Sequence, residues 1–187
     1  MRLFLAINLE PRIRRAVRDA TTALRDVAPT LSWVDEARLH LTLKFLGECR
    51  DAVVPALNAA LDDVSRRHRV FPMRLREIGA FPNFRRARVV WLGVEREPRL
   101  ELLHHDVELA CEREGFEIEG RPFRPHLTLA RVKPRAGMDE LRRLGRAARA
   151  LAFEDETLVD TIDLMQSTPD GTGARYQRLH AASLRAG

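Results

Sequence analysis

The chain has 187 residues, enough for one domain or for two small lobes that share a core. Hydrophobic residues make up 45% of it, and the longest apolar run is too short to cross a bilayer, which argues against a membrane protein. Its 32 Lys and Arg exceed its 27 Asp and Glu, and the net charge of +5 suits a polyanionic partner such as RNA. An arginine-rich coding bias would give the same excess, because only Lys44 and Lys133 are lysines. The two cysteines match no disulfide or metal spacing, so we expect a cytoplasmic protein.

The hydrophobic pattern predicts strands and helices with no linker between them. Residues 2–9 read as a strand that stops before Pro11, and the apolar residues of 11–28 recur at helical spacing. The predicted elements that follow are a strand at 39–47, a helix at 51–68, strands at 70–78 and 88–95, a helix at 98–114, a strand at 123–132, a helix at 138–150, and strands at 158–166 and 175–184. Because each half supplies two helices and several strands, we expect one α+β domain over residues 1–187 with two similar lobes.

One tetrapeptide, His-Leu-Thr-Leu, occurs twice, at residues 40–43 and 126–129. Side chains alternate along a strand, so His40 and Thr42 share one face, and His126 and Thr128 share one face in the second copy. The leucines between them are expected to face the core. Two such strands side by side would present two imidazoles and two hydroxyls to one small pocket.

Two histidines around one ligand suit acid–base catalysis near neutral pH. Neither histidine has a serine or cysteine beside it to act as a nucleophile, and neither motif completes a recognisable zinc site. A single histidine in a strand is more often structural than catalytic, but an exact second copy favours a shared site. The pattern therefore indicates proton transfer at a phosphate, with water or a ribose hydroxyl as the attacking group.

The stretches "RLFLAINL", "LHLTLKFLGE", "GAFPNFRRARVVWLGV" and "RPFRPHLTLARV" resemble the 2H phosphoesterase superfamily, and within it the RNA 2′,3′-cyclic phosphodiesterases, also called 2′-5′ RNA ligases. The resemblance implies a bilobal fold with an antiparallel sheet in each lobe and the active cleft between them. It also implies hydrolysis of RNA 2′,3′-cyclic phosphate ends to 2′-phosphomonoesters without metal or cofactor, with reversible 2′-5′ ligation as a related reaction. By the same resemblance His40 is the proton donor, His126 is the proton acceptor, and Thr42 and Thr128 hold phosphate oxygens.

Three further residues are candidates for substrate binding. Arg131 resembles a basic residue that the family uses near the phosphate, although strict alternation from His126 places it on the wrong face. Lys44 is the competing cation because it is in phase with His40. Phe4 matches an aromatic position of the family's first strand, where it would stack on a base or serve as a core residue.

The expected partner is RNA with a 2′,3′-cyclic phosphate end, for example a tRNA fragment, and nothing in the sequence demands more than a monomer. Two alternatives stay open at this point. The same site could act on small cyclic nucleotide derivatives, or the chain could be a non-catalytic module that binds RNA ends.

Overall fold

The computed structural model describes residues 1–134, 136–171 and 173–186. Its strands are β1 (Arg2–Asn8), β2 (Ser32–Trp33), β3 (His40–Glu48), β4 (Phe71–Phe81), β5 (Val89–Val94), β6 (His126–Arg131), β7 (Glu154–Val159), β8 (Thr161–Pro169) and β9 (Ala174–Ser183). Its α-helices are α1 (Pro11–Ala20), α2 (Thr22–Val27), α3 (Val54–Ser65), α4 (Pro98–Arg113) and α5 (Met138–Ala150), with short 3₁₀ turns at Glu36–Arg38, Asp51–Val53 and Phe84–Arg86.

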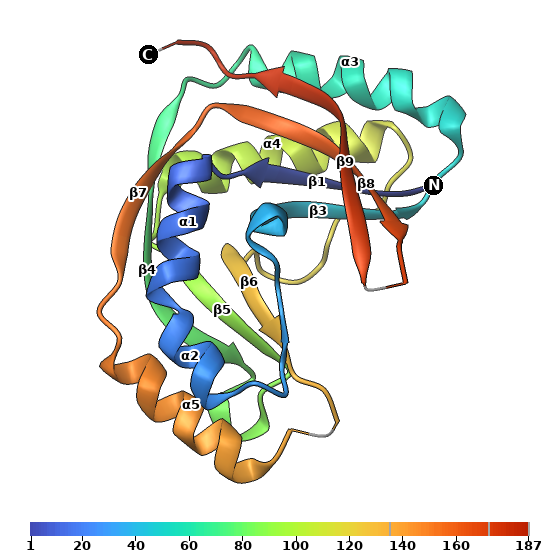
Figure 1. Ribbon diagram of the computed structural model, residues 1–187. Helices are drawn as coiled ribbons and strands as arrows, with labels where there is room; N and C mark the ends of the chain where they lie inside the picture. The colour runs from blue at the N-terminus through green and yellow to red at the C-terminus, as the bar shows by residue number, and fades with distance from the viewer. Residues whose placement is uncertain (135, 172, 187) are drawn as a thin grey trace.

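The named strands of the described residues form one antiparallel sheet in the order β7-β4-β5-β6-β3-β1-β8-β9, and β2 pairs with the far end of β6. In its middle, β3 and β6 are joined by the pair Leu41 and Leu127. The sheet therefore consists of two four-stranded halves, each with one motif strand at the shared boundary, and it curls strongly (Figure 1). The predicted α+β class with two similar antiparallel halves is confirmed, with the addition that the two sheets join into one.

The helices cover the outer face of the curled sheet (Figure 1). Helices α3 and α4 pack on each other, α3 also contacts β8 and β9, and α4 contacts β3. Over the other half, α5 packs on α2 and β4, and α1 contacts β7. The main core lies beneath α1, α3 and α4, and a second cluster lies beneath α2 and α5. No helix in the described part of the chain combines the length and apolar character needed to cross a membrane.

The predicted helix at 11–28 is wrong in one respect, because Thr21 divides it into α1 and α2. The buried Thr21 hydroxyl donates to the carbonyl of Val17 at 2.8 Å and lies 3.2 Å from that of Arg18. A threonine that bonds back to the preceding turn competes with the helical ladder and bends the chain. The break lets α2 turn towards α5.

The predicted strand at 158–166 is also wrong, because two strands, β7 and β8, meet at Asp160. Strand β7 begins with Glu154, Asp155 and Glu156, residues that are rare in strands and that hide its period-2 pattern. It pairs with β4 alone among the described strands, so it forms the outer edge of its half, where charged side chains are tolerated.

Candidate active site

The two repeated motifs lie side by side at the boundary between the halves. Leu41 and Leu127 pair directly and are both fully buried, as expected for the inward-facing residues. The antiparallel register that they set places His40 across from Thr128, and Thr42 across from His126. Directly opposed residues of an antiparallel pair have Cβ atoms about 4.5–5.5 Å apart, so the four polar side chains share one face of the sheet.

Each imidazole is held by an equivalent hydrogen bond to the backbone two residues before it. Nδ1 of His40 lies 2.7 Å from the carbonyl oxygen of Arg38, and Nδ1 of His126 lies 2.7 Å from that of Arg124. Because a carbonyl oxygen only accepts, each Nδ1 carries a hydrogen and donates it. Each Nε2 is therefore the atom that can take up or release a proton, and that of His40 lies 3.1 Å from the Thr42 hydroxyl.

An aromatic cluster surrounds His40. The Phe4 ring lies 5.1 Å from the imidazole, and Tyr176 meets it edge-on at 5.4 Å. Desolvation by this packing lowers the pKa of His40, and the positive charge of Arg131 lowers it further, against the opposing hydrogen bond to the carbonyl of Arg38. The expectation that Phe4 stacks on a base is wrong, because its side chain is only 3% exposed. Its ring packs against the His40 imidazole instead.

A β-bulge follows the threonine in each motif strand. In β3 the pairing with β1 skips Leu43, and in β6 the pairing with β5 skips Leu129. A bulge adds one residue to one strand and so shifts the alternation beyond it. Leu43 and Lys44 are consequently both buried on the helix-covered face of the sheet, and so are Leu129 and Ala130 in the second motif strand.

The bulge changes which of the two candidate cations lies on the motif face. Beyond it, Arg131 is exposed on the face of His126 and close enough to His40 to affect its pKa. The corresponding residue of the other motif is Phe45, which is 66% exposed. Strict alternation would place Arg131 on the opposite face from His126, and the extra residue of the bulge returns it to the same face.

The expectation that Lys44 faces the phosphate is wrong. Its ammonium group is buried beneath α4, where it pairs with the Glu108 carboxylate and donates to the carbonyl of Glu117 at 2.7 Å. The same carboxylate oxygen accepts a hydrogen bond from the backbone N–H of Glu119. This buried pair ties β3 to the segment 114–125, which leads directly to His126.

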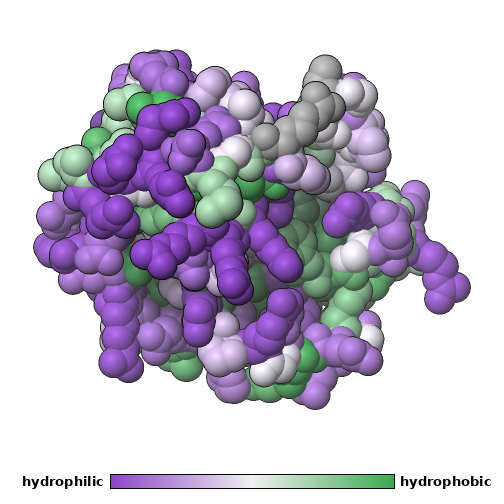
Figure 2. Space-filling model, turned by 90° about the horizontal axis from the view of Figure 1, so that it is seen from below, coloured by the Kyte–Doolittle hydropathy of each residue, from purple (hydrophilic) through white to green (hydrophobic). Residues whose placement is uncertain are grey.

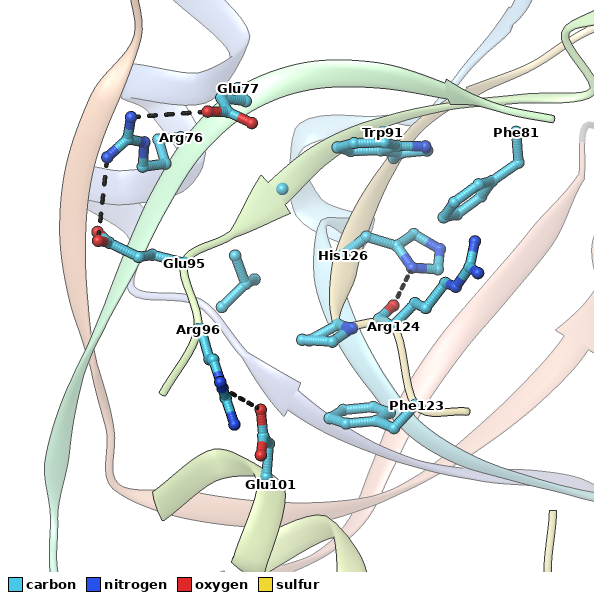
Figure 3. A pocket seen from close by; sticks show the side chains of 13 residues that line it. Arg76, Glu77, Phe81, Trp91, Glu95, Arg96, Glu101, Phe123, Arg124 and His126 are labelled. Atoms are coloured by element: carbon cyan, nitrogen blue, oxygen red, sulfur yellow. Dashed lines mark hydrogen bonds and ion pairs between the residues drawn. The ribbon is translucent and has the colours of Figure 1, made fainter. Parts of the chain in front are cut away.

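A cavity of about 690 Å³ lies beside His126 (Figure 3). Phe81 meets the His126 ring edge-on at 5.1 Å, and Trp91 lies 5.3 Å from Phe81. The Trp91 ring lies over Gly79, where a Cβ atom would approach within 2.2 Å of it, so glycine is required at that position. These aromatic residues are not among the site residues predicted from the sequence, although Trp91 stands between the buried Val90 and Leu92 and alternation alone places it on the motif face.

The molecular surface also shows a hollow. On the face shown in Figure 2, hydrophilic side chains dominate and surround a recess with apolar walls.

The chain is similar to known proteins in both sequence and structure. Residues 9–171, which include both motifs, match the model of the 2′-5′ RNA ligase superfamily. The chain belongs to this superfamily. Among curated superfamily relatives, the RNA 2′,3′-cyclic phosphodiesterase of Thermotoga maritima is 30% identical over 191 residues, covering 100% of this chain and 97% of the relative. That of Thermus thermophilus is 39% identical over 140 residues, covering 71% and 69%.

Solved structures of the superfamily agree over nearly the whole chain. The crystal structure of TT0787 from Thermus thermophilus superimposes with a TM-score of 0.81 at 32% identity, covering 100% of this chain and 99% of that one. The E. coli LigT structure complexed with 3′-AMP gives a TM-score of 0.75 at 27% identity, covering 98% and 97%. Both the curled sheet and its paired motif strands therefore lie within the shared structure.

Proposed function

We propose that this protein hydrolyses the 2′,3′-cyclic phosphate at RNA ends to a 2′-phosphomonoester. The observation that carries the proposal is the pairing of the two motif strands at Leu41 and Leu127, which gathers two histidines and two threonines on one face. The printed names of the curated relatives, RNA 2′,3′-cyclic phosphodiesterase, support the same reaction.

In the proposed mechanism, Nε2 of His126 takes a proton from water as its oxygen attacks phosphorus. The bond between phosphorus and O3′ breaks, and Nε2 of His40 gives its proton to the departing O3′. Burial lowers the pKa of His40, so its imidazolium releases that proton readily. The hydroxyls of Thr42 and Thr128 donate to the phosphate oxygens, and Arg131 offsets the charge that builds on them.

The test uses a short RNA that ends in a 2′,3′-cyclic phosphate, incubated with the purified protein in EDTA. We expect a 2′-phosphate terminus, and a fall in turnover of about 10²- to 10⁴-fold for His40→Ala and for His126→Ala. His105→Ala, an exposed histidine on α4, is the matched control and should keep full activity. A 3′-phosphate product, full activity in either motif variant, or no opening by the folded wild type would contradict the proposal.

The finer expectations belong to the same proposal. We propose that the substrate is an RNA fragment such as a cleaved tRNA, that the enzyme works as a monomer without metal or cofactor, and that it acts in the cytoplasm. The free thiols of Cys49 and Cys111 agree with a reducing compartment. Comparing RNA ends with 2′,3′-cyclic AMP in the same assay separates the RNA substrate from a small cyclic nucleotide, and size-exclusion chromatography tests the monomer.

A further inference from the structure

The carbonyl groups that hold the two motif imidazoles have different supports. The carbonyl that holds His40 belongs to the last residue of the 3₁₀ turn Glu36–Arg38, which the Asp35 side chain caps. The carbonyl that holds His126 lies in residues 116–125, a segment without helix or strand. Local hydrogen bonds fix a carbonyl in a capped turn, whereas a carbonyl in an irregular segment depends on contacts with other elements.

Helix α4 supplies such contacts along one side. Residues three or four positions apart form one stripe on a helix, and the stripe in question consists of His104, Glu108 and Cys111. The carbonyl of Cys111 accepts a hydrogen bond from the backbone N–H of Phe116 at 3.0 Å. The Glu108 carboxylate accepts one from the N–H of Glu119 at 3.1 Å, and the His104 ring stacks on Phe123. The segment therefore runs back along α4 and contacts each successive turn.

The stack of His104 on Phe123 is the contact of this stripe that lies nearest to His126 in the chain. The two ring centroids are 3.8 Å apart, and the planes differ by only 6°. Nε2 of His104 lies 3.6 Å from the Glu108 carboxylate, too far for a hydrogen bond, so it is the flat face of the ring that contacts the segment. Burial, as the main cause, lowers the pKa of His104, which keeps this ring uncharged near pH 7.

Phe123 directly precedes Arg124, whose carbonyl accepts the hydrogen bond from Nδ1 of His126 (Figure 3). An imidazole can turn about its bond to Cβ, and the hydrogen bond at Nδ1 prevents this rotation. It also keeps the ring hydrogen on Nδ1 and leaves Nε2 free to take up a proton. A displaced Arg124 carbonyl would therefore misdirect Nε2 and would permit the other tautomer, in which Nε2 carries the hydrogen and cannot accept one.

We propose that His104 is a positioning residue: by stacking on Phe123, its ring fixes the carbonyl that orients His126. His104 acts from behind the site, since it is not among the described residues that line the cavity beside His126. The inference rests on the proposed function, in which His126 is the proton acceptor. It makes the two motif histidines unequal, because the support of His126 comes from α4 and that of His40 comes from its own turn.

The first test is kinetic. In His104→Ala, kcat on a cyclic-phosphate RNA should fall by about 10- to 100-fold while KM stays within about twofold, because the substrate contacts remain and the acceptor is displaced. His104→Phe keeps a flat ring against Phe123 and should recover most of the lost kcat. His105→Ala is the matched control, because it removes an exposed ring from the next position of α4.

Urea titrations identify conditions in which each of these variants is folded. Under those conditions, an unchanged kcat in His104→Ala, a failure of His104→Phe to recover kcat, or a rise in KM alone would overturn the proposal.

The second test reads the tautomers without turnover. The NMR chemical shifts of the two ring nitrogens show which of them carries the hydrogen in a neutral imidazole. In the wild type, His40 and His126 should both carry it on Nδ1, as their bonds to carbonyl oxygens require. In His104→Ala, His126 should shift towards the Nε2 tautomer that a free imidazole favours, whereas His40, held by the capped turn, should not change.

An unchanged tautomer of His126, or an equal change in both histidines, would overturn the proposal even if the protein opens cyclic phosphates. A change in His126 alone, in a protein that opens no cyclic phosphate, would instead support the positioning by His104 and refute the proposed hydrolysis.

Discussion

Leu41 of β3 pairs with Leu127 of β6, and this pair is where the two halves of the sheet become continuous. Each leucine is flanked by the histidine and the threonine of its motif. The relative position of the two imidazoles therefore depends on the packing of two buried aliphatic side chains, which lie on the opposite face of the sheet from the chemistry.

This dependence predicts that Leu127→Ala will affect both stability and turnover. Truncating a buried leucine costs about 2–5 kcal/mol of the free energy of unfolding. Leu144→Ala, in the separate cluster under α5, is the matched control, because Leu144 is equally buried but lies away from the motifs. Urea titrations identify a temperature at which both variants are folded. At that temperature we expect kcat on a cyclic-phosphate RNA to be lower for Leu127→Ala and unchanged for Leu144→Ala. Equal kcat values in the two variants would argue against the dependence.

Arg131→Gln should reduce kcat/KM without unfolding the protein. Hydrogen bonds to charged groups contribute about 1.5–3 kcal/mol, which corresponds to roughly 10- to 150-fold. The change leaves the fold intact because the Arg131 side chain is exposed. Lys133→Gln, two residues further on and also exposed, should change kcat/KM by less than about twofold, as surface substitutions usually do. If the two variants behave alike, Arg131 is not the phosphate cation.

The pH profile should report the environment of His40. Because the proton donor must be protonated, kcat/KM should fall as pH rises through the pKa of His40, which burial, and secondarily Arg131, hold below its ordinary value of 6.5. Arg131→Gln removes a positive charge that disfavours the imidazolium, so the alkaline limb should move to higher pH. Profiles measured on the wild type and the variant test this, and a limb that stays in place or moves to lower pH would contradict the role of His40 as donor.

The buried pair of Lys44 and Glu108 should contribute to stability and to the position of His126, not to phosphate binding. Lys44→Met leaves the Glu108 carboxylate buried without its cation and should cost about 3–5 kcal/mol. The double variant Lys44→Met with Glu108→Leu should recover much of that loss and retain turnover when folded. Urea unfolding measures the stability of the double variant, and kinetics on a cyclic-phosphate RNA measure its turnover. A double variant that is stable but inactive would indicate that Lys44 binds the phosphate.

Much of this fold can be predicted from sequence because its strands and helices carry clear periods. Helix α5 begins and ends at the predicted residues, 138 and 150, and the His-Leu-Thr-Leu alternation correctly separates the buried leucines from the polar face. The split at Thr21 and the charged edge strand β7 could not be predicted in this way. The split comes from the choice of the Thr21 hydroxyl to bond to the preceding turn, which the apolar period does not report, and β7 depends on its pairing with the distant strand β4.

The candidate site shows the same division. The residue types and spacing predict two histidines and two threonines around one phosphate, but the cation and the aromatic residues depend on geometry. Strict alternation favours Lys44, and a single bulged residue reverses that preference in favour of Arg131. The partners of His40 and His126, Phe4 and Phe81, come from strands whose pairing the sequence pattern does not specify.

The two bulges give the site a direction. Their backbone paths are alike, so the scaffold alone would accept a phosphate in either of two orientations related by a half-turn. The residues that emerge beyond them are a hydrophobic ring, Phe45, in one half and a permanent cation, Arg131, in the other. One orientation therefore places an anionic oxygen against a guanidinium, and the other places it against a phenyl ring. With Arg131 as the phosphate cation proposed above, this difference favours one orientation of the substrate in a nearly symmetric scaffold, and with it one direction of proton transfer.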